Sequence, residues 1–249
     1  MIVLKSAREI ERMQEAGKLL ASIHKEIAHM IKPGITTWEI DEFVDEYLAK
    51  HGAKPEQKGY RGYQYATCAS INDEVCHGFP RKDPLKEGDI VTIDMVVNLN
   101  GALADSAWSY AVGKVSDEAE NLLKVTKEAL YRGIEQCVPG SRVGDIGHAI
   151  QTLVEGEGMS VVREFIGHGI GATIHEKPDI PHFGLPGKGA RLKEGMVFTI
   201  EPMVNLGEWK TKMDSNGWTA RTIDNKLSAQ YEHTIAITKN GPIILTDQN

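Results

Sequence analysis

The 249-residue chain contains little cysteine and no long apolar run. Its three cysteines are an odd number without a C-x-x-C pair, which argues against a disulfide framework or a structural zinc knot and indicates a reducing compartment. No stretch approaches the roughly 18 apolar residues that a membrane helix needs. Charged residues follow the first few apolar ones at once, so no signal peptide is expected. We therefore expect a cytoplasmic protein that does not bind membranes.

Basic residues are also in the minority. Lysine and arginine total 28 against 35 aspartates and glutamates, a net charge of −7, which argues against direct nucleic-acid binding. The hydrophobic fraction of 41% and the charged fraction of 25% are typical of a globular protein rather than a disordered one. The length fits one large domain or two small ones and is sufficient to bury a sizeable core.

The chain carries two internal echoes at nearly one offset. Residues 85–94 align with 192–201 at an offset of 107 (192 minus 85), with six of the ten residues identical and a carboxylate at the end of each copy. Residues 33–40 align with 139–146 at an offset of 106. The alternative is that Lys-Glu-Gly is simply a common turn before a strand. That would explain one of the two echoes but not both. Two halves with one helix–strand plan are indicated, rather than a solenoid, which needs three or more shorter repeats. The expected organisation is one domain, 1–249, with a pseudo-repeat of roughly 1–112 and 113–249 whose equivalent strands meet centrally.

Helix start signals and hairpin signals indicate an α+β fold. Ser6 with Glu9 and Thr36 with Glu39 form capping boxes, and the apolar spacing behind Ser6 has one gap, at Gly17. Hairpin signals outnumber β-α-β signals, which favours a mainly antiparallel sheet. The expected helices begin at 6, 36, 117 and 143, the expected strands are 67–71, 75–77, 89–97, 102–112, 161–165, 196–200, 219–223, 231–238 and 243–245, and 168–188 is expected to be loop-rich.

Carboxylates interrupt these apolar strands at Asp94, Asp105, Glu201 and Glu232. Burying a charge is costly unless it is paired or binds a metal. A hairpin at Asn100-Gly101 is expected to pair residues whose numbers sum to about 199, and 94 plus 105 is 199, so Asp94 and Asp105 are expected to be cross-strand neighbours. Like charges directly opposite are destabilising, so a cation between them is expected. The simpler alternative is that a bulge turns one of the two toward solvent.

His168 lies in a Gly-His-Gly-Ile-Gly run whose glycines leave its imidazole unobstructed, which suits a ligand. With the four carboxylates it forms a set that is too large and too negative for one tetrahedral zinc. Such an oxygen-rich set suits two adjacent divalent ions, with manganese, iron or cobalt favoured. Two such ions can activate water and polarise a carbonyl, which is hydrolase chemistry. His77 and His175, expected in loops or at strand ends, are candidates for contacts to these groups or to a substrate.

The order of these residues resembles methionine aminopeptidases, type I, of the bacterial kind, and the likeness extends over nearly the whole chain. The segments that carry it are Ser-Ile-Asn-Asp-Glu-Val-Cys-His77-Gly, Asp94 and Asp105 eleven residues later, Gly-His168-Gly-Ile-Gly, Thr-Ile-Glu201-Pro-Met, Gly217-Trp218-Thr219 and Gln-Tyr-Glu232-His-Thr. The resemblance implies the pita-bread α+β fold, with a curved, mainly antiparallel sheet and two pseudo-twofold-related halves. It implies a single catalytic domain that removes the initiator methionine from nascent polypeptides when the second residue is small.

The resemblance also implies a role for each site residue. Asp94 would bind one metal, His168 and Glu201 the other, and Asp105 and Glu232 would bridge the two ions. Glu201 would also be the general base, and His77 and His175 would contact the substrate. The residues implied around the methionine pocket are Tyr60, Tyr63, Cys68 and Trp218. The chain departs from the pattern of some relatives at Gln57, Phe79 and Val96, which affects the expected shape of the pocket rather than the expected reaction.

Two further functions stay open at this point. A proline-specific peptidase has the same fold, but such relatives usually carry an added N-terminal domain that this length does not supply. A metal-free binding protein on this fold would have lost ligands, and all five are present. The expected partners are nascent polypeptide N-termini, with a transient ribosome contact that no basic tail marks, and the expected oligomeric state is a monomer.

Overall fold

The computed structural model describes residues 1–249 and contains four α-helices and many short strands. The helices are α1 (Ala7–Met30), α2 (Thr37–Lys50), α3 (Asp117–Glu135) and α4 (Val143–Gly156), with one 3₁₀ turn, η1 (Tyr60–Gly62). The strands are β1 (Ala53–Pro55), β2 (Cys68–Ile71), β3 (Glu74–Cys76), β4 (Ile90–Leu99), β5 (Ala102–Ala111), β6 (Ser160–Val161), β7 (Gly167–Gly169), β8 (Glu176–Ile180), β9 (Val197–Ile200), β10 (Met203–Asn205), β11 (Thr211–Met213), β12 (Ala220–Thr222), β13 (Ser228–Gln230), β14 (His233–Thr238) and β15 (Gly241–Ile244). The expected helices and the mixed α+β class are confirmed.

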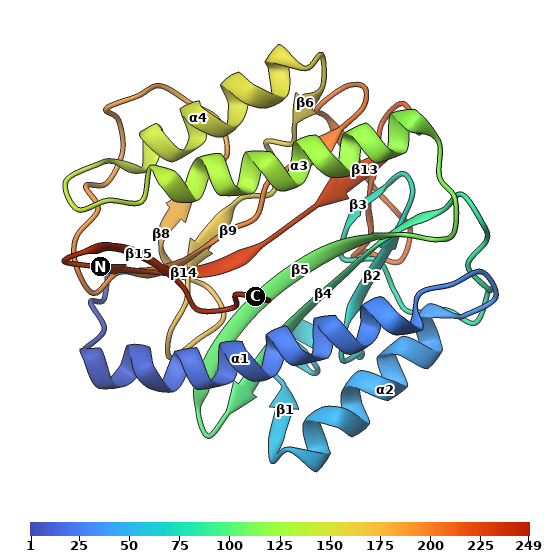
Figure 1. The fold of residues 1–249 in the computed structure, drawn as a ribbon, viewed down its shortest axis with the longest axis horizontal. Helices are drawn as coiled ribbons and strands as arrows, with labels where there is room; N and C mark the ends of the chain where they lie inside the picture. The colour runs from blue at the N-terminus through green and yellow to red at the C-terminus, as the bar shows by residue number, and fades with distance from the viewer.

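Every strand pairing is antiparallel, as expected from the hairpin signals. The sheet around β4 has β1, β2 and β5 as its other strands, and a second sheet runs in the order β15-β14-β9-β7-β8. The two sheets meet where β5 and β14 lie side by side (Figure 1). There the backbone N–H of Asp105 donates to the Thr234 hydroxyl at 3.0 Å, and the N–H of Glu232 donates to the Ala107 carbonyl at 2.8 Å. Residues from both halves of the chain are therefore adjacent along this seam.

The helices cover these sheets in two pairs. Figure 1 shows α1 and α2 beside β4 and β5, and α3 and α4 together on the opposite side of the molecule. Both expected capping boxes are present, at Ser6 and Thr36, and each supplies partners for backbone N–H groups that a helix start leaves free. None of the helices combines the length and the apolar character that crossing a membrane requires.

Gly17 explains the gap in the apolar spacing of α1. The C-terminal segment crosses the helix at this point, and a Cβ atom on residue 17 would lie 2.0 Å from the carbonyl oxygen of Leu245. On either side of it, Met13 and Leu20 are buried in the core shared with β4 and β5. The missing side chain is thus a packing requirement of the fold.

The two echoing segments form equivalent structures. Residues 85–94 lead into β4 and residues 192–201 lead into β9, and each of these strands is paired with one strand of the central seam, β5 or β14. The strands that meet at the centre are thus β5 and β14, which are the pairing partners of β4 and β9, and not β4 and β9 themselves. The division into halves at residue 112 and the assignment of one catalytic domain stay predictions.

Several strand predictions were wrong in detail. The strand expected over 161–165 is only the two residues of β6, since residues 162–165 leave the sheet. The segment 168–188, expected to be loop-rich, contains β8 and part of β7, so that His168 lies on a strand. Strands β1, β10, β11 and β13 were not predicted, because each is three residues long and too short to show periodicity.

Candidate metal centre

Every residue that the sequence suggested for the site lines one pocket at the seam between the two sheets. The cavity has a volume of about 210 Å³. An apolar cavity of about 150 Å³ holds one benzene ring, so this pocket is the size of a single large side chain. The suggested residues that line it are Tyr60, Tyr63, Cys68, His77, Asp94, Asp105, His168, His175, Glu201, Trp218 and Glu232.

The two aspartates of the β4–β5 hairpin share a face, but they are not directly opposite as predicted. Leu99 pairs with Ala102, so partner numbers sum to 201 (99 plus 102) rather than 199, and Asp105 lies opposite Val96. The turn is at Asn100-Gly101 as predicted, but a turn there gives a sum of 201, so the predicted register of the strands was wrong. Because Asp94 and Val96 are two residues apart, Asp94 and Asp105 become diagonal neighbours on one face. Both side chains still line the same pocket.

The four carboxylates lie close together on the wall of the pocket, with Asp105 and Glu232 buried and Asp94 and Glu201 partly buried. Burial raises the pKa of Asp94 to about 7 and that of Glu201 to about 8. Burial also raises the pKa of Asp105 and Glu232 well above their ordinary values, and repulsion among the four carboxylates adds to this. Four negative charges at such close quarters need protons or a cation to be tolerated.

His168 completes the cluster from β7. Its Nε2 atom lies 3.4 Å from Glu201 Oε1 and 3.7 Å from Asp105 Oδ2. Burial lowers the pKa of His168 to about 4, which leaves the ring neutral and its nitrogen free to donate a lone pair at neutral pH. The flanking glycines are needed because a Cβ at Gly167 would lie 2.5 Å from the Thr199 carbonyl oxygen.

The cluster fits a divalent cation. Asp105, His168 and Glu232 each offer one ligand atom, and these atoms lie within 4.8 Å of one another. Asp105 Oδ1 is buried and has no hydrogen-bond partner, which is costly for a carboxylate oxygen unless a ligand takes that place. Carboxylate oxygens with one imidazole nitrogen suit manganese, iron or cobalt. Glu201 and Asp94 adjoin this group.

Glu201 is held by residues that the sequence reasoning missed. The Thr199 hydroxyl donates to its Oε1 at 2.8 Å, and the Gln230 amide lies 3.4 Å from its Oε2. The buried ring of His182 accepts the backbone N–H of Glu201 at 3.0 Å. Thr199 is detectable in principle, because residues two apart on a strand share a face. His182 gives no local signal, since only the tertiary fold brings it to β9.

Two further histidines, His77 and His175, line the pocket. The ring centroids of His175 and His168 are 4.2 Å apart with the rings tilted, and His175 Nδ1 lies 3.0 Å from the Tyr60 hydroxyl. His77 adopts a left-handed backbone conformation with φ of 57°, which costs about 1–2 kcal/mol for a residue with a side chain. Burial lowers the pKa of His77 to about 4. Both histidines contribute neutral rings to the pocket.

The remaining wall is aromatic and apolar. Tyr63 packs edge-on against Trp218 with ring centroids 5.1 Å apart, and its hydroxyl donates to the Thr67 carbonyl at 2.8 Å with the Gly78 carbonyl 3.1 Å away. Phe165 and Met203, which were not predicted, add further apolar surface. Gln57 also lines the pocket. It binds to β4, because its amide oxygen accepts the Val96 N–H at 2.6 Å. A flexible, polarisable thioether suits such a slot.

Fold and site together define a class: an α+β protein with a buried carboxylate–histidine centre of the kind that holds divalent metals beside an apolar pocket.

Comparison with known proteins agrees with this class. A model of the family described as metallopeptidase family M24 matches residues 11–239. Methionine aminopeptidase 1 of Bacillus subtilis (strain 168) is 50% identical over 246 residues, which cover 99% of both chains. The crystal structure of methionine aminopeptidase from Rickettsia prowazekii matches with a TM-score of 0.98 at 44% identity, covering 99% of this chain and 100% of that one. The chain therefore belongs to metallopeptidase family M24, and within it to the methionine aminopeptidases of the bacterial type I kind.

The likeness to a prolidase is one of fold alone. The prolidase from Pyrococcus horikoshii OT3 has a TM-score of 0.79 at 23% identity, and the match covers 100% of this chain but 65% of that one. The fold shared by these proteins is the pita-bread α+β fold, as the resemblance in sequence implied.

Proposed function

We propose that this chain is a metal-dependent hydrolase that removes the N-terminal methionine from nascent proteins and peptides when the second residue is small. The observation that carries the proposal is the single pocket in which four carboxylates and an imidazole adjoin an apolar aromatic wall. Membership of the methionine aminopeptidases supports the same reaction. A free amino terminus at the carboxylates and a thioether against Tyr63 and Trp218 would use both parts of the pocket.

Two divalent ions, of cobalt, manganese or iron, are the proposed cofactors. Asp94 would hold one ion, His168 and Glu201 the other, and Asp105 and Glu232 would contact both. When bound, the ions supply Lewis acidity, which polarises the scissile carbonyl and lowers the pKa of water. The orphaned Asp105 oxygen and the raised pKa values of the carboxylates support such occupancy.

The protein groups would divide the remaining work. Glu201 would accept the proton of the attacking water and pass it to the leaving amine, since its Oε1 is oriented by Thr199 and its backbone by His182. His77 and His175 would contact the amine or carbonyl region of the substrate and stabilise the transition state as neutral rings. The side of the pocket with Tyr60, Tyr63, Cys68 and Trp218 would hold the methionine side chain.

The proposed substrate sets the expected partners. Nascent polypeptide N-termini occur in the cytoplasm, at the ribosome. We therefore expect the enzyme to act there and to contact the ribosome transiently. A monomer is sufficient, because one chain supplies every residue that lines the pocket.

The test is hydrolysis of Met-Ala-Ser, Met-Lys-Ser and Ala-Pro-Ala by chelator-treated protein with and without added cobalt or manganese. We expect release of methionine from Met-Ala-Ser alone, and only with metal. Cleavage only before proline would support a proline-specific peptidase. Absence of cleavage with every metal, in protein shown to be folded, would contradict the proposal.

A further inference from the structure

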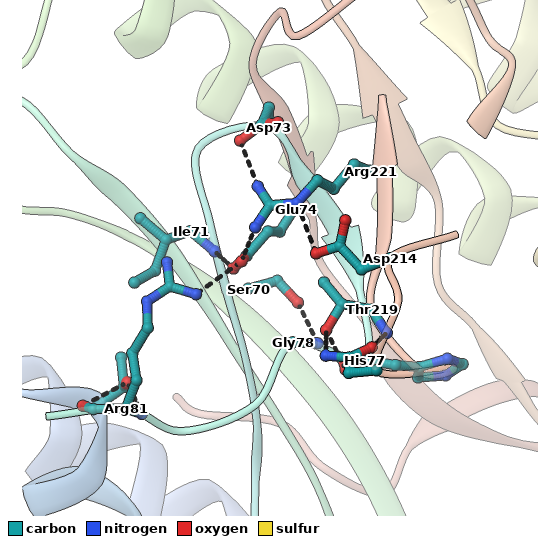
Figure 2. A network of polar contacts seen from close by, with 12 residues as sticks. Ser70, Ile71, Asp73, Glu74, His77, Gly78, Arg81, Asp214, Thr219 and Arg221 are labelled. Carbon is teal, nitrogen blue, oxygen red and sulfur yellow. Dashed lines mark hydrogen bonds and ion pairs between the residues drawn. The ribbon is translucent and has the colours of Figure 1, made fainter. Parts of the chain in front are cut away.

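A network of ion pairs lies behind His77, on β3 and the hairpin formed by β11 and β12 (Figure 2). Arg221 uses all of its nitrogens in this network. Its Nε donates to Asp214 at 2.7 Å, and its two terminal nitrogens donate to Asp73 at 2.9 Å and to Glu74 at 2.8 Å. Arg221 therefore ties its own hairpin to the strand that leads into His77.

Glu74 is the centre of the network. Its side chain is only 1% exposed, and a buried carboxylate needs several partners. It accepts from Arg221, from Arg81 at 2.6 Å and from the backbone N–H of Ile71 at 2.6 Å. These charge-assisted bonds hold β3 from three directions, three residues before His77.

The backbone pairing of β3 with β12 is irregular. Between β3 and β12 the register shifts, since Cys76 pairs with Ala220 but Glu74 pairs with Arg221. Such an irregularity interrupts the ladder of backbone hydrogen bonds. The Arg221–Glu74 ion pair bridges the two strands at this irregularity.

His77 depends on the placement of these strands. Its left-handed backbone is held by contacts from both sides: the Thr219 hydroxyl donates to the His77 carbonyl at 3.3 Å, and the next N–H, of Gly78, donates to the Ser70 hydroxyl at 3.1 Å. Thr219 directly precedes β12, the strand that Arg221 secures. Figure 2 shows the ring of His77 pointing away from the ion pairs, and this ring lines the pocket.

We infer that Arg221, through Glu74, is a positioning residue that sets the orientation of His77 in the pocket. The inference rests on the proposed function, in which His77 contacts the substrate. Arg221 itself touches no substrate. Its effect on the reaction passes through the backbone of β3 and of residue 219.

A double-mutant cycle on kcat for Met-Ala-Ser tests this coupling. Arg221→Met keeps the aliphatic stem and removes every ion pair. We expect kcat to fall about 10- to 100-fold in the wild-type background, because small displacements of a group at the reacting centre have effects of this size. In the His77→Ala background, the same substitution is expected to change kcat less than about twofold, since the group that it positions is gone.

Two variants control for unspecific effects. Arg132→Met removes an arginine with ion pairs on the exposed surface of α3 and is expected to leave kcat unchanged. Leu122→Ala creates a cavity in the core of the second half, at a residue that does not line the pocket, and is expected to lower the melting temperature. It is expected to leave kcat unchanged in folded protein, which separates positioning from loss of stability.

Hydrogen exchange gives a readout that does not need activity. Arg221→Met is expected to accelerate amide exchange in peptides covering 74–79 and 219–222, and not in α3. Unchanged exchange in 74–79 would overturn the inference, and so would an equal fall in kcat in the two backgrounds. If wild-type protein released no methionine, the proposed function would fail, and the exchange result alone would decide whether Arg221 positions residue 77.

Discussion

Replacing Glu201 with glutamine is expected to stabilise the metal-free protein while it removes most of the activity. Glu201 has an ordinary pKa of 4.5, which burial raises to about 8 in the folded state. A raised pKa stabilises the folded protein at low pH, and this contribution is lost as the pH rises from about 4.5 to about 8. Glutamine does not ionise in this pH range, so the stability of the variant does not fall with pH for this reason.

The size of the effect follows from the same values. At about 1.4 kcal/mol per pH unit, the interval between 4.5 and about 8 corresponds to about 5 kcal/mol above pH 8. Asp94, Asp105 and Glu232 share the repulsion and can retain a proton in place of Glu201, so we expect about 2 kcal/mol. For a chain of this length that is a rise in melting temperature of about 4–8 °C.

The local geometry permits the substitution. The new amide oxygen can still accept the Thr199 hydroxyl bond. Its nitrogen would face the Gln230 amide, whose own oxygen is buried without a partner and can turn to accept the new bond. The change therefore leaves no polar group newly unpaired.

The assay is thermal unfolding of chelator-treated wild type and Glu201→Gln between pH 5 and pH 9. The wild type should lose stability as the pH rises, and the difference between the two proteins should grow with pH. Glu118→Gln on the exposed surface of α3 is the control and should behave as wild type. With metal added, the turnover of Glu201→Gln should fall about 10²- to 10⁴-fold, as for loss of a general base. A variant no more stable than wild type at pH 8, or one with unchanged turnover, would refute the reasoning.

Three further outcomes are expected. Chelation should abolish methionine release, and added manganese or cobalt should restore it and raise the melting temperature with metal concentration; a melting temperature independent of metal would contradict a resident ion. His168→Ala should weaken metal binding in calorimetry and keep the fold by circular dichroism, and unchanged affinity would remove it from the ligand set. Gly17→Ala should destabilise by about 2–4 kcal/mol because its Cβ meets the Leu245 carbonyl, whereas Gly156→Ala, with open space around it, should change stability little in denaturant unfolding.

Features that depend on residues close together in the sequence could be predicted without the structure. The capping boxes at Ser6 and Thr36 predicted two helix starts correctly, since capping depends on residues three apart. The Asn100-Gly101 turn predicted a hairpin that exists, although its register was placed wrongly. The pairing of Cys68 with Asp94 across β2 and β4 had no local signal, since it joins segments that are distant in sequence.

The site was predictable to the extent that its residues have unusual surroundings in the sequence. Carboxylates at Asp94, Glu201 and Glu232 stand out because apolar strands do not ordinarily tolerate them. The residues that hold them do not stand out. His182 and Gln230 contact Glu201 only because the chain folds back across β9, and Gln57 reaches β4 from a loop.

By itself, the sequence determined the helices, the antiparallel plan and the set of acidic residues that demand a cation, because each depends on nearby residues and on the cost of buried charge. Only the tertiary structure decided the register of the β4–β5 hairpin, the side-by-side placement of β5 and β14 that unites the two halves of the pocket, and the ion pairs that join Glu74 to Arg221. These features arise from contacts between residues more than a hundred positions apart or from the count of residues in one turn. Periodicity along the chain carries no information about either.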